Sequence, residues 1–116
     1  MTAGTYTITI EQGATFSLPI TWKDQLGNAV NLTGYTARLQ VREEVESATP
    51  FLTLTTENGG IALGGAAGTI TLTVTATATA ALTASKGVYD LELISGGGVI
   101  TRLLEGLVVI KKEVTR

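Results

Sequence analysis

The chain has 116 residues, with 8 basic and 10 acidic side chains and a formal net charge of -2. The charges are spread without a long basic run, so nucleic acid and anionic membranes are disfavoured as partners. The sequence has no Cys and no His, which removes disulfides, the commonest metal ligands and the usual general base. We therefore expect no catalytic residue, no metal site and no cofactor.

Length and composition predict one all-β domain spanning residues 1–116. A chain of this size can bury one core but is too short to divide. Only 16% of the residues are charged, and the abundant threonine suits the solvated faces of strands. No apolar run is long enough to span a membrane, and the N-terminus lacks the pattern of a signal peptide. We expect neither a membrane span nor signal-peptide export.

Alternating apolar and polar residues predict three strands in the first half, over residues 5–10, 14–23 and 35–42. Pro19 lies inside the second run and has no N–H to donate, so it must lie at a sheet edge or a bulge. The side chains expected to face the core are Tyr6, Ile8 and Ile10; Phe16, Leu18, Ile20 and Trp22; and Tyr35, Ala37, Leu39 and Val41.

Two features of this half could be read as binding sites. Trp22 could be a platform on which a ligand stacks, but it shares the parity of the preceding apolar residues, which favours a place in the core. Asn31 begins a triplet that matches a glycosylation acceptor, within the loop at residues 23–34. A local turn bonded by the Asn31 side chain is the simpler interpretation.

Charged residues gather at the end of the third strand, where Arg38 and Arg42 precede Glu43, Glu44 and Glu46. We interpret them as a solvated strand face with cross-strand charge pairs. The three glutamates could in principle supply an acid and a base, but nothing in the pattern buries them or separates their pKa values. The two aspartates, Asp24 and Asp90, are too far apart in sequence to predict a calcium site.

In the second half, short strands are expected at residues 51–56 and 69–75, with a brief apolar step at 61–63 between them. The run from Gly64 to Gly68 lacks the Lys-Ser/Thr pair and the helix of a phosphate-binding loop, so it predicts a hairpin connection. From Thr77 to Leu82 the alternation could continue as a strand. The alanines favour a helical turn instead.

The most organised stretch is the hairpin at residues 87–110, with Tyr89, Leu91 and Leu93 on one face and a glycine-rich turn from Ser95 to Gly98. After the turn, Leu103 is expected to face one way and Leu104 the other, together with Arg102. Residues 107–110 are apolar on both faces, which suits a strand that is covered on both sides or closes an interface. In all, about seven strands predict a sandwich of two antiparallel sheets.

The segment Ser85-Lys86-Gly87-Val88-Tyr89-Asp90-Leu91 resembles the tyrosine corner of immunoglobulin-like domains, although Ser85 replaces the usual Asp and the chain has no Cys pair. The resemblance implies that the Tyr89 hydroxyl bonds to upstream backbone and pins the connection between the sheets, and that Leu91 is a core residue. The expected fold class is therefore an immunoglobulin-like antiparallel β-sandwich.

A second resemblance involves Gly27-Asn28-Ala29-Val30-Asn31-Leu32-Thr33-Gly34, then Gly87-Val88-Tyr89-Asp90-Leu91-Glu92-Leu93, and a closing strand with Glu105-Gly106. These stretches, in this order, look like the N-terminal domain of phage baseplate upper proteins and related small prophage tail proteins. The resemblance implies a non-enzymatic structural protein of a phage or prophage virion, in the tail or baseplate region, made in the cytoplasm of the bacterial host.

The expected partners are other virion or tail proteins, together with further copies of the chain. Low surface charge and the resemblance favour a homo-oligomer, with a trimer or a hexamer expected. Two alternatives come from other classes: a carbohydrate-binding or adhesin-type β-sandwich, and an accessory domain of an enzyme complex. Sugar binding would require exposed aromatic rings, and most of the six aromatic residues have inward parities.

Overall fold

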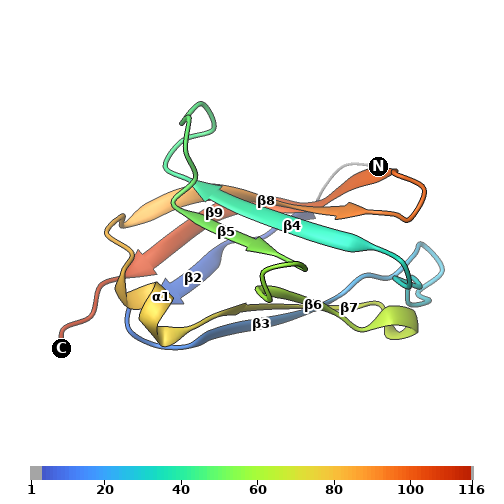
Figure 1. Cartoon of the computed structure of the whole chain (residues 1–116), viewed down its shortest axis with the longest axis horizontal. Helices are drawn as coiled ribbons and strands as arrows, with labels where there is room; N and C mark the ends of the chain where they lie inside the picture. The colour runs from blue at the N-terminus through green and yellow to red at the C-terminus, as the bar shows by residue number, and fades with distance from the viewer. Residues whose placement is uncertain (1–3, 116) are drawn as a thin grey trace.

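Two β-sheets pack face to face in the computed structural model, which describes residues 4–115 (Figure 1). The larger, six-stranded sheet has the order β1-β9-β8-β4-β5, with β2 also paired to β9, and the smaller sheet has the order β3-β7-β6. The larger sheet contains β1 (Gly4–Thr5), β2 (Ile8–Glu11), β4 (Thr36–Arg42), β5 (Leu52–Thr55), β8 (Lys86–Ile94) and β9 (Ile100–Lys111). The smaller sheet contains β3 (Phe16–Thr21), β6 (Ile61–Leu63) and β7 (Thr69–Val74).

This topology is that of an immunoglobulin-like sandwich, which confirms the expected fold class. Strands β3, β7 and β6 take the places of B, E and D, while β4, β8 and β9 take those of C, F and G. Strand β5 lies beside β4, as the additional strand of variable-type domains does. The first two strands differ from the simple antiparallel expectation, because β1 and β2 run parallel to β9.

One hydrophobic core lies between the sheets and is built from the inward residues of both. Strands β4, β7 and β8 follow the expected alternation, because every second side chain in each is buried. Burying one such aliphatic side chain contributes about 1.5–3 kcal/mol, so this face dominates the stability of the fold. The most completely buried aliphatic residues are Ile10, Leu32, Leu39, Val41, Ile70, Leu72, Leu91, Leu93 and Val108.

Strand β3 is an edge of the smaller sheet, which confirms the expectation for Pro19. The proline lies opposite Thr71 of β7, and within residues 4–115 strand β3 pairs with β7 alone. Trp22 follows β3, packs against the core and meets Tyr35 edge-on, with ring centroids 6.2 Å apart and ring planes at 88°. The core interpretation of Trp22 is confirmed in part, because the side chain is only partly buried.

The segment after β7 is helical, as the alanine content indicated. Helix α1 (Ala76–Ala80) begins earlier than expected, because Thr75 caps it by accepting a hydrogen bond from the backbone N–H of Ala78. Thr79 is fully buried, and its hydroxyl donates to the carbonyl of Ala14 (2.8 Å) and accepts from the N–H of Gly13 (3.0 Å). The helical turn therefore fixes the connection between β2 and β3. A 3₁₀ turn, η1 (Gly65–Ala67), joins β6 to β7 as the hairpin connection expected there.

The first strand is interrupted, and the inward position expected for Tyr6 is wrong. Its side chain is 47% exposed, and the residue lies between β1 and β2. The Tyr6 carbonyl accepts a hydrogen bond from the Tyr89 hydroxyl (2.7 Å), and the Tyr6 N–H donates to the carbonyl of Glu105 (3.1 Å). A Cβ on Gly106 would lie 2.4 Å from the Tyr6 oxygen, so the two backbones approach this closely only because residue 106 is glycine.

The tyrosine-corner resemblance is confirmed in part for Tyr89, because its hydroxyl bonds to upstream backbone, the carbonyl of Tyr6. Its hydroxyl reaches the N-terminal strand, 83 residues away in the sequence, rather than the connection between the two sheets. Tyr89 therefore holds the first strand against β8 and β9. Leu91 is fully buried, as the same resemblance implied.

A β-bulge in β9 reverses the parity expected after the hairpin turn. Leu91 lies opposite Leu104, whereas the next residue, Glu92, lies opposite Arg102, so Leu103 is the extra residue. Leu103 and Leu104 consequently both pack against the core, and the expectation that they face opposite ways is wrong. Beyond the bulge, Val108 and Ile110 are buried, while Leu107 and Val109 on the other face are 57% and 40% exposed.

Candidate functional site

The outer face of the larger sheet forms a shallow groove, hereafter the outer-face groove. It arises because the outward residues of β4, β8 and β9 lie side by side, and the loop at residues 43–51 rises above this layer (Figure 1). Polar and charged side chains line most of the groove, with three aliphatic ones among them. The lining residues are Thr5, Arg38, Gln40, Arg42, Val45, Val88, Tyr89, Asp90, Glu92, Arg102, Glu105, Gly106 and Leu107.

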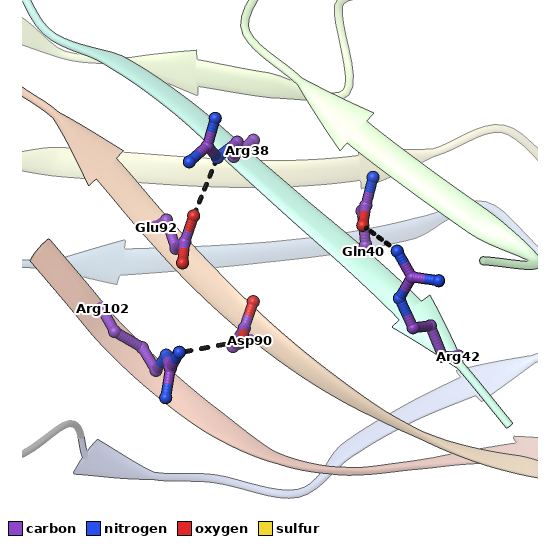
Figure 2. Close-up of polar contacts among 6 residues, drawn as sticks. All are labelled: Arg38, Gln40, Arg42, Asp90, Glu92 and Arg102. Atoms are coloured by element: carbon purple, nitrogen blue, oxygen red, sulfur yellow. Dashed lines mark hydrogen bonds and ion pairs between the residues drawn. The ribbon is translucent and has the colours of Figure 1, made fainter. Parts of the chain in front are cut away.

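The charged side chains of the groove lie in rows that follow the strands (Figure 2). The row on β4 is basic, with Arg38 and Arg42, and the row on β8 is acidic, with Asp90 and Glu92. The antiparallel register places Arg38 opposite Glu92, and Arg42 opposite Val88. Strand β9 contributes one charge of each sign to the groove, Arg102 and Glu105.

Ion pairs link these rows within the chain. Arg38 Nε lies 2.8 Å from Glu92 Oε1, while Arg102 contacts Asp90 and Glu105 at 3.5 Å each. The two arginine side chains are about half exposed, so each pair contributes at most about 1 kcal/mol. The prediction of a solvated face with cross-strand charge pairs is confirmed for Arg38.

Arg42 has a different role from the one expected, because it fixes the adjoining loop. Its guanidinium donates to the Ser47 carbonyl (2.7 Å) and to Gln40 Oε1 (2.8 Å). Ser47 Oγ in turn accepts from the N–H of Glu44 (3.1 Å). The loop thus presents the exposed side chains of Glu43, Glu44, Val45 and Glu46 at one end of the groove.

Two ionisable groups of the groove have shifted pKa values. Burial raises the pKa of the Asp90 carboxyl, and the nearby charge of Glu92 acts in the same direction, while Arg102 opposes both. Burial, with a smaller effect of Tyr6, raises the pKa of Tyr89 from 10.0 to about 12. Tyr89 is therefore neutral at physiological pH, and the Tyr6 carbonyl already accepts its proton in a hydrogen bond.

The other candidate residues from the sequence serve local structure. Asp24 Oδ1 accepts from the N–H groups of Leu26 and Asn28, and Asn31 Oδ1 accepts from the N–H of Thr33, so each side chain stabilises a turn. Across residues 4–115, no cluster of three or more His, Cys, Asp or Glu could hold a metal ion. No helix in this described range is both long and apolar enough to cross a membrane.

Sequence reasoning identified the residues of β4 but not the outer-face groove to which they belong. Glu92, Asp90 and Arg102 were visible only as outward positions of a hairpin. Placing them beside Arg38 requires knowing that β4 pairs with β8, a contact between residues more than fifty positions apart. The outward alternation of both segments was the available signal, and strand order was the missing information.

Comparison of the sequence with protein-family models and with curated proteins gives no match. Among solved structures, the chain is similar to the extracellular domains of the voltage-gated sodium channel beta4 subunit, described as parallel homodimers that explain its role in cell-cell adhesion. The likeness has a TM-score of 0.47 and 13% identity, and it covers 98% of this chain and 97% of that chain. A likeness this distant supports no argument about function.

Proposed function

We propose that the chain is a non-enzymatic structural protein of a phage or prophage tail that acts through protein-protein assembly. The observation that carries the proposal is the outer-face groove: a broad, solvent-facing sheet surface with balanced charges and exposed aliphatic side chains. Such a surface suits a protein partner, because interfaces combine an apolar centre with a charged and polar rim.

The phage assignment is supported by the two stretches that resemble tail proteins. One of them, residues 27–34, belongs to the loop between β3 and β4, and the other, residues 87–93, belongs to β8. The second stretch contributes Asp90 and Glu92 to the outer-face groove. The resemblance therefore includes residues of the proposed contact surface as well as residues of the core.

A catalytic role is disfavoured by the environment of the acidic groups. Glu43, Glu44 and Glu46 project into solvent from the loop, and the groove carboxylates lie beside arginines on an open surface. A carboxylic acid and a carboxylate working as a pair need environments that push their pKa values apart, usually through deep burial of one. Asp90 shows a shift of this direction, but its side chain is 41% exposed and close to Arg102.

The carbohydrate-binding alternative ranks lower because the aromatic side chains are not displayed. Of the six aromatic residues, all within the described range, only Tyr6 is exposed. Stacking on a sugar ring needs an accessible aromatic face, and one half-exposed tyrosine beside a strand break does not provide a platform.

The proposed function is tested by asking whether the chain is part of a particle. An epitope-tagged copy is expressed in the bacterium that carries the gene, phage or tail particles are induced and purified, and the tag is located by immunogold electron microscopy. We expect labelling at the tail or baseplate. Particles that contain the other tail proteins but no tagged chain would contradict the proposal.

A further inference from the structure

Aliphatic side chains at one end of the outer-face groove, and Val109 just beyond it, are not covered by the rest of the described residues 4–115. Leu107 and Val109 belong to β9, which lies between β8 and β2 and is therefore central in its sheet. Central position does not bury them, because their side chains point outward and are 57% and 40% exposed. Val45 lines the same groove and is 76% exposed. An exposed aliphatic patch with a charged rim is typical of a surface that binds another protein.

The arrangement of the charged rows indicates which kind of protein binds the outer-face groove. The groove carries three arginines and three carboxylates, so its lining has no excess of either sign to select a strongly acidic or basic partner. The signs are instead sorted, with basic side chains on β4 and acidic ones on the neighbouring β8. A surface divided in this way is complementary to itself after a rotation that exchanges the two rows.

We infer that the outer-face groove binds a second copy of this chain, related by a two-fold axis that runs along the strands between β4 and β8. This inference rests on the proposed assembly function and names its partner and contact. The rotation places β4 of each copy over β8 of the other, so that Arg38 faces the partner's Glu92 and Glu92 faces the partner's Arg38. An axis across the strands would instead place β4 over β4 and oppose the two basic rows.

The same rotation accounts for the exposed loop. The loop follows Arg42, which pairs with Val88 of β8. The next outward residues in that direction are Lys86 of β8 and Val109 of β9, which pair with each other. The acidic loop of one copy therefore comes over the end of the other copy that carries Lys86 and Lys111. Val45 at the loop tip meets the aliphatic patch of Leu107 and Val109.

The size of the face is sufficient for such a contact. The chain measures 44 × 27 × 24 Å, and the larger sheet forms one of its two layers. A standard specific interface buries about 800 Å² on each partner, which a face of these dimensions can supply. Of the two symmetries expected from the sequence, a hexamer made of three such dimers contains this two-fold contact, whereas a simple trimer does not.

The test is a charge swap between two copies. Arg38→Glu and Glu92→Arg each oppose like charges across the axis, and we expect each variant to dimerise at least about tenfold more weakly than the wild type. In a mixture of the two variants, the new glutamate of one faces the new arginine of the other, and the unchanged Arg38 faces the unchanged Glu92. The mixture should therefore recover dimer. Light scattering coupled to size exclusion, over a range of micromolar concentrations, measures all four samples. Circular dichroism confirms that each variant is folded.

Two further variants sharpen the result. Lys23→Glu makes the same change in net charge as Arg38→Glu, but in the loop after β3, and should leave association unchanged. Val45→Asp, at a side chain too exposed to affect folding, should weaken it.

Each remaining outcome overturns the inference. Variants that associate as strongly as the wild type would place the contact elsewhere and leave the assembly function standing. Weakened variants that do not recover on mixing would exclude the two-fold pairing. A strictly monomeric wild type would exclude self-association, and particle labelling would then decide the proposed function independently.

Discussion

Tyr89→Phe tests whether one hydroxyl holds the N-terminal strand in place. Tyr89 is only 5% exposed, and its hydroxyl donates a 2.7 Å hydrogen bond to the carbonyl of Tyr6, where the strand is interrupted. The substitution removes the donor and leaves a partly buried carbonyl without that partner, which costs about 1–3 kcal/mol. We therefore expect a lower urea midpoint at pH 7.5 with an unchanged slope.

The shifted pKa gives the same substitution a pH signature. A rise from 10.0 to about 12 means that the folded chain favours the neutral tyrosine. The resulting stability is fully present below pH 10 and is lost as the pH rises through 12. At about 1.4 kcal/mol per pH unit the loss approaches roughly 3 kcal/mol. Wild type should therefore be the more stable protein at neutral pH, and its advantage over Tyr89→Phe should shrink as the pH rises from 10 to 12.

Tyr35→Phe is the matched control, because the Tyr35 ring packs against Trp22 and, within residues 4–115, no hydrogen bond involves its hydroxyl. Its stability difference from the wild type at neutral pH should be small. If Tyr89→Phe gives the same midpoint as the wild type, and the two proteins lose stability in parallel above pH 10, the hydroxyl does not hold the first strand.

Three further substitutions test single features of the fold. Gly106→Ala should destabilise the fold by more than about 2 kcal/mol in urea unfolding, because the new Cβ would lie 2.4 Å from the Tyr6 oxygen. The control Gly27→Ala has open space around its new Cβ and should cost only about 1 kcal/mol for its positive φ. Asp90→Asn should raise the urea midpoint at pH 7, because burial raises the pKa of the Asp90 carboxyl and so penalises its ionised form, and this advantage should be lost below pH 4. A lower midpoint at pH 7 would mean that the contact with Arg102 outweighs the effect of burial. The Asn58 side chain accepts from the N–H of Thr55 and donates to the carbonyl of Thr53 along β5, an outer strand of its sheet. Asn58→Ala should therefore lower the stability by about 1–2 kcal/mol and increase thioflavin-positive aggregation through this edge. Aggregation equal to that of the wild type would show that the edge needs no such cap.

Much of the fold could be read from local pattern. In strands that alternate cleanly, such as residues 69–75, the side chains predicted to face the core are the buried ones, because one buried face fixes which side chains of a strand point inward. Pro19 and the alanine-rich turn were also predictable, since a missing N–H and a high helix propensity are properties of single residues or short segments. These expectations required no knowledge of which strands are neighbours.

The errors arose where two distant segments determine the local geometry. Tyr6 lies outside the core because its carbonyl is fixed over Gly106 and by the Tyr89 hydroxyl, contacts made by the last hairpin. Leu104 lies inside because the bulge at Leu103 is inserted opposite β8. Neither feature changes the hydrophobic pattern of its own strand, so pattern alone could not reveal it. The outer-face groove was missed for the same reason.

The bulge also explains why an exposed aliphatic patch remains on β9. Without it, the parity of Leu91 and Leu93 would carry Glu105 into the core, which would bury an unpaired charge at high cost. With it, Glu105 faces outward beside Arg102, and Val108 and Ile110 face the core. Residues 107–110 are all aliphatic, however, so either register leaves two of them in solvent. Within residues 4–115 no shift of register removes that exposure, and the second copy that we propose would cover Leu107 and Val109.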